Sequence, residues 1–195
     1  MTLTEASRVL EEKYPRGFDV TFFHSVCKKL KRVVILRTSW YPEIVDGLVA
    51  SAKAYLKENH VPDAAVEVMH VPGSFELPLA AQEYLNLNPE HRPEIILALG
   101  CVLRGDTPHF DFVCHGVTQG LMAVTLEHHT PVGFGVLTVD TVAQAHSRGA
   151  KGAEAAQAAL AMLLLRRHLE HHHGYSEGHL SHKKTVGAQS PALKR

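Results

Sequence analysis

Four short apolar runs, each followed by a segment with helical character, constrain the fold of this chain more than any other feature. The runs cover residues 33–36, 65–71, 94–99 and 132–137. Strands that are apolar on both faces and alternate with helices are typical of a parallel sheet covered by helices on each side. The sequence therefore predicts an α/β fold, a three-layer α/β/α sandwich around a four-stranded parallel sheet.

The segments between and after these runs are predicted as helices. The last of them is rich in Ala and Leu and carries few charges on any face, so it needs more than one covering surface. We expect a subunit interface to provide the second surface. The predicted helices cover residues 42–57, 75–87, 108–128, a stretch from Thr141 onwards, and 151–169.

The two ends of the chain differ from its middle. Residues 1–31 are predicted as an appendage, with a short helix over 6–14 and an added strand over 18–26 that could join a neighbouring subunit. Residues 32–173 form the predicted α/β domain. Residues 174–195 are polar and are predicted as a disordered tail, with a metal-binding histidine tract as the sharper alternative.

The composition excludes several classes of protein. The formal net charge is zero, whereas a nucleic-acid-binding protein is expected to carry a basic face. No apolar run reaches the length of about 18 residues that a membrane span needs. Cys27, Cys101 and Cys114 show no CxxC spacing, which fits a reducing compartment. The acidic N-terminus lacks an apolar signal core, so we expect a cytoplasmic protein without nucleic-acid or membrane partners.

The third predicted strand ends in a turn suited to an anion. Thr107 can cap the following helix, and Pro108 fits the first helical position, where no N–H is needed. The turn over 105–107 would then direct free backbone N–H groups and a positive helix end at a phosphate. His109 adds a group able to exchange protons near neutral pH. Together these features indicate an enzyme acting on a small phosphorylated molecule.

Four motifs in this order resemble those of one family. They are Val45-Asp46-Gly47-Leu48, the VPGSFELP run from Val71, the GDTPHFD run from Gly105, and the FGVLT run from Phe134. In them the chain resembles the lumazine synthases, which make the penultimate intermediate of riboflavin biosynthesis. The similarity covers about two-thirds of the chain, over residues 33–165.

The resemblance implies a flavodoxin-like sheet and a specific reaction. 5-Amino-6-ribitylaminouracil condenses with 3,4-dihydroxy-2-butanone 4-phosphate to give 6,7-dimethyl-8-ribityllumazine, phosphate and water, through imine formation, phosphate elimination and ring closure. The pyrimidine supplies the nucleophilic amine, so no metal or organic cofactor is implied, and the protein mainly holds two substrates together. A homopentamer, an icosahedral shell as a further state, active sites shared between subunits, and coupling to riboflavin synthase are also implied.

The resemblance assigns substrate-binding residues. The aromatic that stacks on the pyrimidine falls at Trp40, and an aromatic from the neighbouring subunit falls at Phe134. Contacts to the ribityl chain and ring fall at Ser74, Phe75 and Glu76, and backbone contacts to the pyrimidine at Cys101, Val102 and Leu103.

Three of these assignments have a plainer alternative. Trp40 and Phe134 could be ordinary core aromatics, and Glu76 could be a first-turn glutamate favoured by the helix dipole. Cys101 is not predicted as a nucleophile, because no base is paired with it in a recognisable motif.

The phosphate site and the proton-transfer residue are assigned in the same way. Asp106 and Thr107 match the segment that holds the phosphate, which their backbone N–H groups would contact. Arg148 matches an arginine whose fork suits the phosphate, with an exposed helix arginine as the alternative. Lys151 is a further phosphate candidate. His109 matches the catalytic histidine, with the nearby Asp111 as a candidate partner.

The chain also departs from the family pattern. Trp40 stands where Phe is commonest and Tyr41 where Asn is common, and the segment 148–152 is shorter than usual. A flavin- or lumazine-binding protein with lost or reduced catalysis is therefore the alternative function. A generic nucleotide-binding protein is disfavoured, because neither GxGxxG nor GxxxxGK[ST] occurs.

Overall fold

Four parallel strands form the centre of the fold, in the order β2-β1-β3-β4. The computed structural model describes residues 20–173 of the chain, with side chains over 21–170. The strands are β1 (Val33–Thr38), β2 (Val66–Val71), β3 (Ile95–Leu103) and β4 (Val132–Val139). The structure confirms the predicted α/β fold and its flavodoxin-like parallel sheet.

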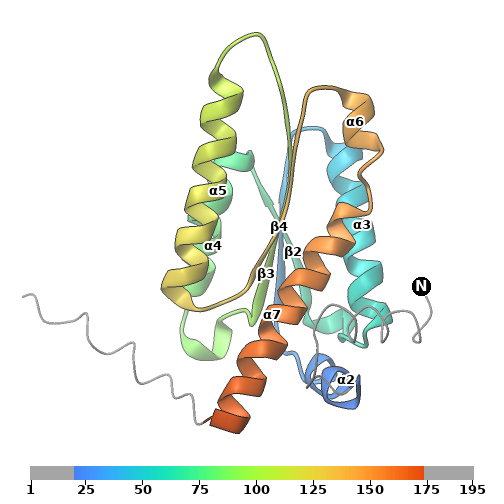
Figure 1. Cartoon of the computed structure of the whole chain (residues 1–195), viewed down its shortest axis with the longest axis vertical. Helices are drawn as coiled ribbons and strands as arrows, with labels where there is room; N and C mark the ends of the chain where they lie inside the picture. The colour runs from blue at the N-terminus through green and yellow to red at the C-terminus, as the bar shows by residue number, and fades with distance from the viewer. Residues whose placement is uncertain (1–19, 174–195) are drawn as a thin grey trace, which may run out of the picture. The chain divides into compact units, whose positions relative to one another are not determined.

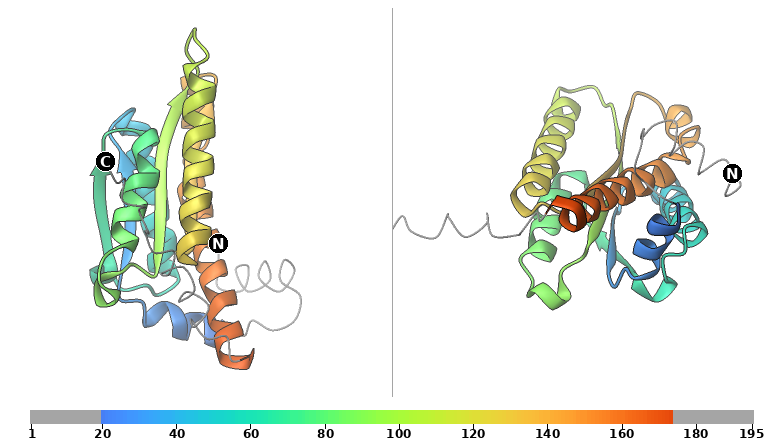
Figure 2. Two further views of the ribbon diagram at one scale, coloured as in Figure 1. Left: turned by 90° about the vertical axis from the view of Figure 1, so that its left-hand side faces the viewer. Right: turned by 60° about the horizontal axis from the view of Figure 1, so that its bottom comes forward.

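Helices cover both faces of this sheet (Figure 1). Helices α4 and α5 lie over one face, and α3, together with the part of α7 up to residue 164, lies over the other. The layers can be followed from two further directions in Figure 2. The helices are α2 (Val20–Lys28), α3 (Pro42–Glu58), α4 (Leu77–Leu85), α5 (His109–His128), α6 (Val142–His146) and α7 (Lys151–His173), with single 3₁₀ turns over Asp63–Ala65, Ser74–Glu76 and Pro89–His91.

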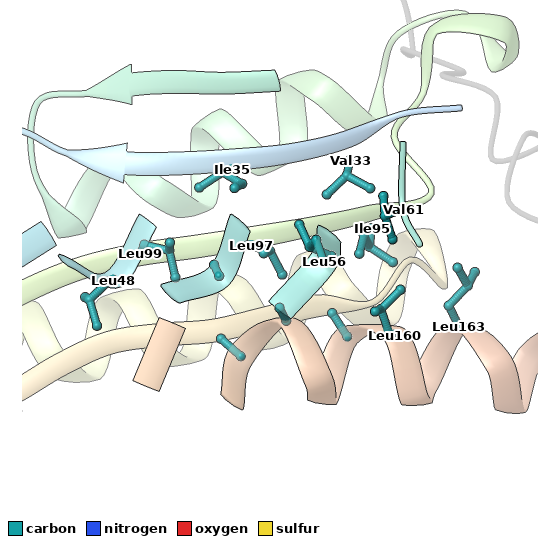
Figure 3. Close-up of a cluster of buried hydrophobic side chains, with 14 of the residues drawn as sticks. Val33, Ile35, Leu48, Leu56, Val61, Ile95, Leu97, Leu99, Leu160 and Leu163 are labelled. Atoms are coloured by element: carbon teal, nitrogen blue, oxygen red, sulfur yellow. The ribbon is translucent and has the colours of Figure 1, made fainter. Parts of the chain in front are cut away.

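Alternate side chains of each central strand pack into two separate apolar clusters. On the α3 side, Val33 and Ile35 of β1 pack with Leu97 and Leu99 of β3, and Leu160 of α7 closes the cluster (Figure 3). On the α4 and α5 side, the intervening positions of the same strands supply the core. These positions are Val34, Leu36, Ile96 and Ala98, packed against Leu77, Ala81, Val117 and Leu121. Burial on both faces explains the near-continuous apolar runs of the sequence.

The strand expected over residues 18–26 is wrong for the part that the structure describes. Residues 20–28 form helix α2, and Phe23, Cys27 and Leu30 are buried in the core cluster on the α3 side. Phe23 and Cys27 are spaced four residues apart, which is the period of one helix face and not of a strand, and Leu30 lies just beyond the end of the helix. The expected helix over 6–14 lies outside the described residues.

The chain divides into two compact units, Met1–Leu164 and Leu165–Arg195. The described part of the second unit is the C-terminal part of α7, where Glu170 forms ion pairs with Arg166 and Arg167. The tail expected over 174–195, with most of its histidines, falls outside the described residues. The domain boundaries therefore stay predictions.

The strand order also fixes where a ligand can bind. From β1 the chain moves to β2 on one side, and then crosses back to β3 on the other side of β1. In open parallel sheets, a crevice forms at the carboxyl ends of the strands where the order reverses in this way. Here that point lies between β1 and β3.

Candidate active site

A cavity of about 440 Å³ lies beyond the carboxyl ends of β1, β2 and β3. It includes all the predicted pyrimidine-site residues except Phe134, and it includes His109. The sheet therefore brings together segments that are far apart in sequence. The lining residues are Trp40, Tyr41, Gly73, Ser74, Phe75, Glu76, Cys101, Val102, Leu103, His109 and Val113.

The side chains of Trp40 and Glu76 both lie beside Gly73. A methyl group placed on Gly73 would lie 2.9 Å from Glu76 Oε2 and 3.6 Å from Trp40 Nε1, so a larger residue there would force the Glu76 carboxylate to shift. Trp40 is 67% exposed, so its alternative as a core residue is wrong. An open indole face beside a carboxylate suits a planar ring that carries hydrogen-bond donors.

Tyr41 adopts the left-handed conformation, with φ of 53° and ψ of 59°, and stands at the start of α3. This conformation is costly for a bulky residue, and Asn is among the side chains that tolerate it best. The departure at this position therefore places an aromatic ring in the cavity wall where a small polar side chain is easier to accommodate. Tyr41 also packs against the core cluster on the α3 side.

Two buried hydroxyl groups lie close to the cavity. Ser74 Oγ and Thr38 Oγ1 both lie beside Gly100, and neither has a hydrogen-bond partner in the structure. Buried polar atoms without a partner are uncommon in folded proteins. Ser74 is also one of the residues that line the cavity.

Cys101 has the chemistry of a structural thiol. Burial and, to a smaller extent, the negative charge of Glu43 raise its pKa to about 11. The nucleophilic form of cysteine is the thiolate, which is scarce at neutral pH when the pKa is this high. The prediction that Cys101 is not a nucleophile agrees with this environment.

The start of α5 differs in detail from the prediction. The helix begins at His109, one residue later than expected, and no side chain caps it, so the predicted Thr107 cap is wrong. Pro108 takes the capping position with helical dihedral angles, and its carbonyl accepts from the N–H of Asp111 at 3.0 Å. His109 is thus the first helical residue and faces the cavity.

Asp111 does not serve as the partner of His109. Its two carboxylate oxygens accept from Arg104 Nη1 and Nη2 at 3.2 and 3.0 Å. Residues two apart on a helix point in different directions, so Asp111 turns away from His109 and toward the turn before the helix. The hydrogen bonds to Asp111, and then those to Asp140, raise the pKa of Arg104.

The predicted phosphate residues lie outside the cavity wall. Asp106 and Thr107 are exposed in the β3–α5 turn. Arg148 follows α6, where its Nη1 donates to the carbonyl of Gln144 at 2.7 Å. Lys151, the first residue of α7, pairs with Glu154. Asp106 and Thr107 thus precede His109 in the β3–α5 turn, whereas Arg148 lies between α6 and α7 and Lys151 begins α7.

Phe134 is set apart from the other predicted residues. It lies on the edge strand β4, is 45% exposed, and does not line the cavity. Its alternative as a buried core aromatic is therefore wrong. An exposed aromatic on a sheet edge is available to another molecule.

Three residues near the site were missed by the sequence reading. Val113 follows His109 by four positions on α5 and therefore shares its helix face, which the periodicity could have revealed. Arg104 and Asp140 directly follow the adjacent strands β3 and β4, and Arg104 Nε lies 3.0 Å from Asp140 Oδ1. Their position at neighbouring strand ends was the available signal.

Comparison with known proteins identifies the family. The family model described as 6,7-dimethyl-8-ribityllumazine synthase matches residues 30–167. A relative from Nocardioides sp. with this name is 43% identical over 71% of this chain and 85% of its own length. Another, from Streptomyces coelicolor, is 46% identical over 60% of this chain and 69% of its own length. A Porphyromonas gingivalis relative is 42% identical over 63% of this chain and 74% of its own.

The chain belongs to the 6,7-dimethyl-8-ribityllumazine synthase family. Its activity is that of a lumazine synthase in riboflavin biosynthesis. Within the part of the chain that the structure describes, no helix combines the length and apolar character needed to cross a membrane.

Proposed function

We propose that the cavity at the ends of β1, β2 and β3 binds 5-amino-6-ribitylaminouracil. The observation that carries this proposal is the convergence of Trp40, Glu76 and His109 on one cavity in a chain of this family. Trp40 stacks on the pyrimidine, and Glu76 accepts from the ring or from ribityl hydroxyls. The free hydroxyl of Ser74 and the backbone of residues 101–103 supply further polar contacts.

The second substrate, 3,4-dihydroxy-2-butanone 4-phosphate, binds with its phosphate at the β3–α5 turn. The backbone of Asp106 and Thr107 and the side chains of Arg148 and Lys151 are its ligands in this proposal. The exposed turn at the N-terminus of a 20-residue helix favours an anion. The pyrimidine amine attacks the ketone and forms an imine with loss of one water, His109 transfers the proton needed as phosphate leaves, and ring closure releases a second water.

The site is completed by a second copy of the chain. Phe134 is exposed on the edge strand, and α5 carries Phe112, Met122 and Leu126 exposed at 72%, 56% and 66%. Phe112 and Leu126 are two heptads apart, so this apolar stripe runs along one helix face. Apolar side chains gathered in this way indicate a protein interface. We therefore propose a homo-oligomer, pentameric or larger, in which Phe134 reaches the cavity of a neighbour.

The decisive assay mixes the purified chain with both substrates and follows lumazine absorbance and phosphate release. Turnover with equal amounts of both products is expected. Tight binding of riboflavin without turnover would contradict the proposal and favour the binding function.

Two substitutions test the site assignment. His109→Ala should lower kcat by about 10²-fold, because it removes the proton-transfer group. Arg148→Ala should mainly raise the KM for the phosphorylated substrate, with a smaller effect on the pyrimidine. Full activity in both variants would overturn the assignment.

A further inference from the structure

Arg104 connects three segments beside the proposed phosphate site. Its backbone N–H donates to the carbonyl of Val139 at 2.9 Å, and its Nε lies 3.0 Å from Asp140 Oδ1. Its other guanidinium nitrogens hold both carboxylate oxygens of Asp111, and the guanidinium carbon lies 4.0 Å from the centre of the Phe110 ring. One residue therefore joins the β3–α5 turn, the first turn of α5 and the β4–α6 turn.

Two partners of Arg104 on α5 lie directly after His109. They are Phe110 and Asp111, in the first turn of the helix. The Phe110 ring packs against the guanidinium of Arg104, and the Asp111 carboxylate binds two of its nitrogens. These contacts fix the direction in which α5 starts relative to the end of β3. His109, as the first helical residue, takes its position from this start.

Asp140, the partner of Arg104 on the β4–α6 turn, is linked to Arg148 through Gln144. The backbone N–H of Asp140 donates to Gln144 Oε1 at 2.8 Å, and Thr141 Oγ1 accepts from the N–H of Gln144 at 3.1 Å. This arrangement is a variant of the capping box that stabilises the start of a helix. The carbonyl of Gln144 in turn accepts from Arg148 Nη1. A continuous set of hydrogen bonds thus runs from Arg104 to Arg148.

The charges also suit this role. Asp111 and Asp140 are two carboxylates next to a site proposed for a phosphate, and Arg104 offsets both of them. Its fork is occupied by these partners, and it does not line the cavity, so it is not itself arranged to bind the substrate. A bidentate pair extended into a network is the arrangement in which exposed ion pairs are most effective.

We infer that Arg104 is a positioning residue, which sets His109 and Arg148 at the separation that the phosphorylated substrate requires. The inference rests on the proposed function, because that proposal assigns the roles of these two residues. Misplacing groups that must act on one bound molecule costs rate even where each group is still present. Arg104 therefore acts on the reaction through its partners.

The test compares Arg104→Gln and Arg104→Lys with the parent chain in steady-state assays that vary each substrate in turn. Arg104→Gln should lower kcat and raise the KM for the butanone phosphate, so that kcat/KM for this substrate falls by about 10- to 100-fold. The KM for the pyrimidine should stay within about twofold, because its proposed ligands are elsewhere. Arg104→Lys, which keeps the charge and loses the fork, should recover part of the loss.

A matched control and a double substitution complete the design. Arg92 precedes β3 at the opposite end of the sheet and also holds a loop, through its Nε and the carbonyl of Leu87, so Arg92→Gln should leave both KM values and kcat unchanged. Asp140→Asn in the Arg104→Gln background should lower kcat/KM little further, because both substitutions break the same series of hydrogen bonds from Arg104 to Arg148.

The outcomes separate the inference from the function on which it rests. If the parent chain makes no lumazine, the proposed function fails. If the parent is active and Arg104→Gln lowers kcat alone, with both KM values unchanged and a reduced melting temperature, the residue is merely structural and the inference is overturned. Unchanged kinetics in Arg104→Gln would overturn it as well.

Discussion

At the scale of single residues, a partly buried triad links Glu67 of the outer strand β2 to Arg32 and to Tyr84 of α4. Glu67 Oε2 accepts from Arg32 Nε and Nη2 at 3.1 and 2.7 Å, and its Oε1 accepts from the Tyr84 hydroxyl at 2.7 Å. The hydrogen bond from Tyr84, together with Arg32, lowers the pKa of Glu67. Burial and the bond to Glu67 raise the pKa of Tyr84 to about 12.

This triad predicts a pH-dependent stability. A carboxylate whose pKa is lowered by folding stabilises the protein above its unfolded pKa of about 4.3 and loses this effect as the pH falls through the folded value. Glu67→Gln should therefore cost about 1 kcal/mol of unfolding free energy at pH 7, a value discounted for partial exposure. The cost should be smaller at pH 3, which lies below the unfolded pKa.

Urea denaturation of both proteins at the two pH values measures the difference. Glu83 is an exposed neighbour of Tyr84 whose side chain makes no hydrogen bond or ion pair with any described residue, so Glu83→Gln is the matched control and should change nothing. A loss for Glu67→Gln that is equal at pH 7 and pH 3 would contradict the charged triad.

The residues that line the cavity could be predicted from the sequence, but the ion pairs beside it could not. Trp40, Glu76 and His109 each follow a strand, and parallel strands bring their ends to one edge, so sequence order sufficed. The pairing of Arg104 with Asp111 and Asp140 depends on which side chains meet across two turns. Sequence spacing suggested His109 for Asp111, but helix geometry excludes it.

At the scale of elements, α2 belongs to the core. Phe23 is 3% exposed, and its side chain packs into the cluster that joins α3, α7 and the sheet. Phe23→Ala should therefore lower the unfolding free energy by about 3–5 kcal/mol, through lost burial and the cavity that remains.

Phe22, on the same helix and only partly buried, is the comparison for this prediction. Phe22→Ala should cost clearly less in the same thermal or urea unfolding experiment. Equal losses at the two positions, or none at either, would mean that α2 is not anchored through Phe23.

The boundaries of the elements were harder to predict than their existence. Strand β3 extends through Gly100 to Leu103 because it pairs with β4 from Ile96 to Leu103, whereas the glycine suggested an earlier end. The helix expected from residue 75 begins at Leu77, since Ser74–Glu76 form a 3₁₀ turn first. In both places long-range contacts override the local signal.

At the scale of the whole molecule, the exposed face of α5 predicts the assembly. Met122→Glu combined with Leu126→Glu places two charges on the apolar stripe, and it should shift the native mass from the oligomer towards the monomer. Both positions are exposed in the single chain, so the fold should be retained, as circular dichroism would show.

A charge change on an exposed position of α3, Lys53→Glu, is the control and should leave the native mass unchanged. An unaltered mass in the α5 variant, or a parent chain that is already monomeric, would contradict this interface.

The parallel pairing of the strands determines when the binding cavity forms during folding. Every strand pair joins residues more than thirty positions apart, so no hairpin can form early and hold part of the sheet. Trp40, Ser74 and Cys101 follow or end three different strands, and they become neighbours only after those strands have docked. The binding cavity therefore has no partly formed precursor during refolding, and ligand binding should return only with the last cooperative step, after helical structure has already appeared.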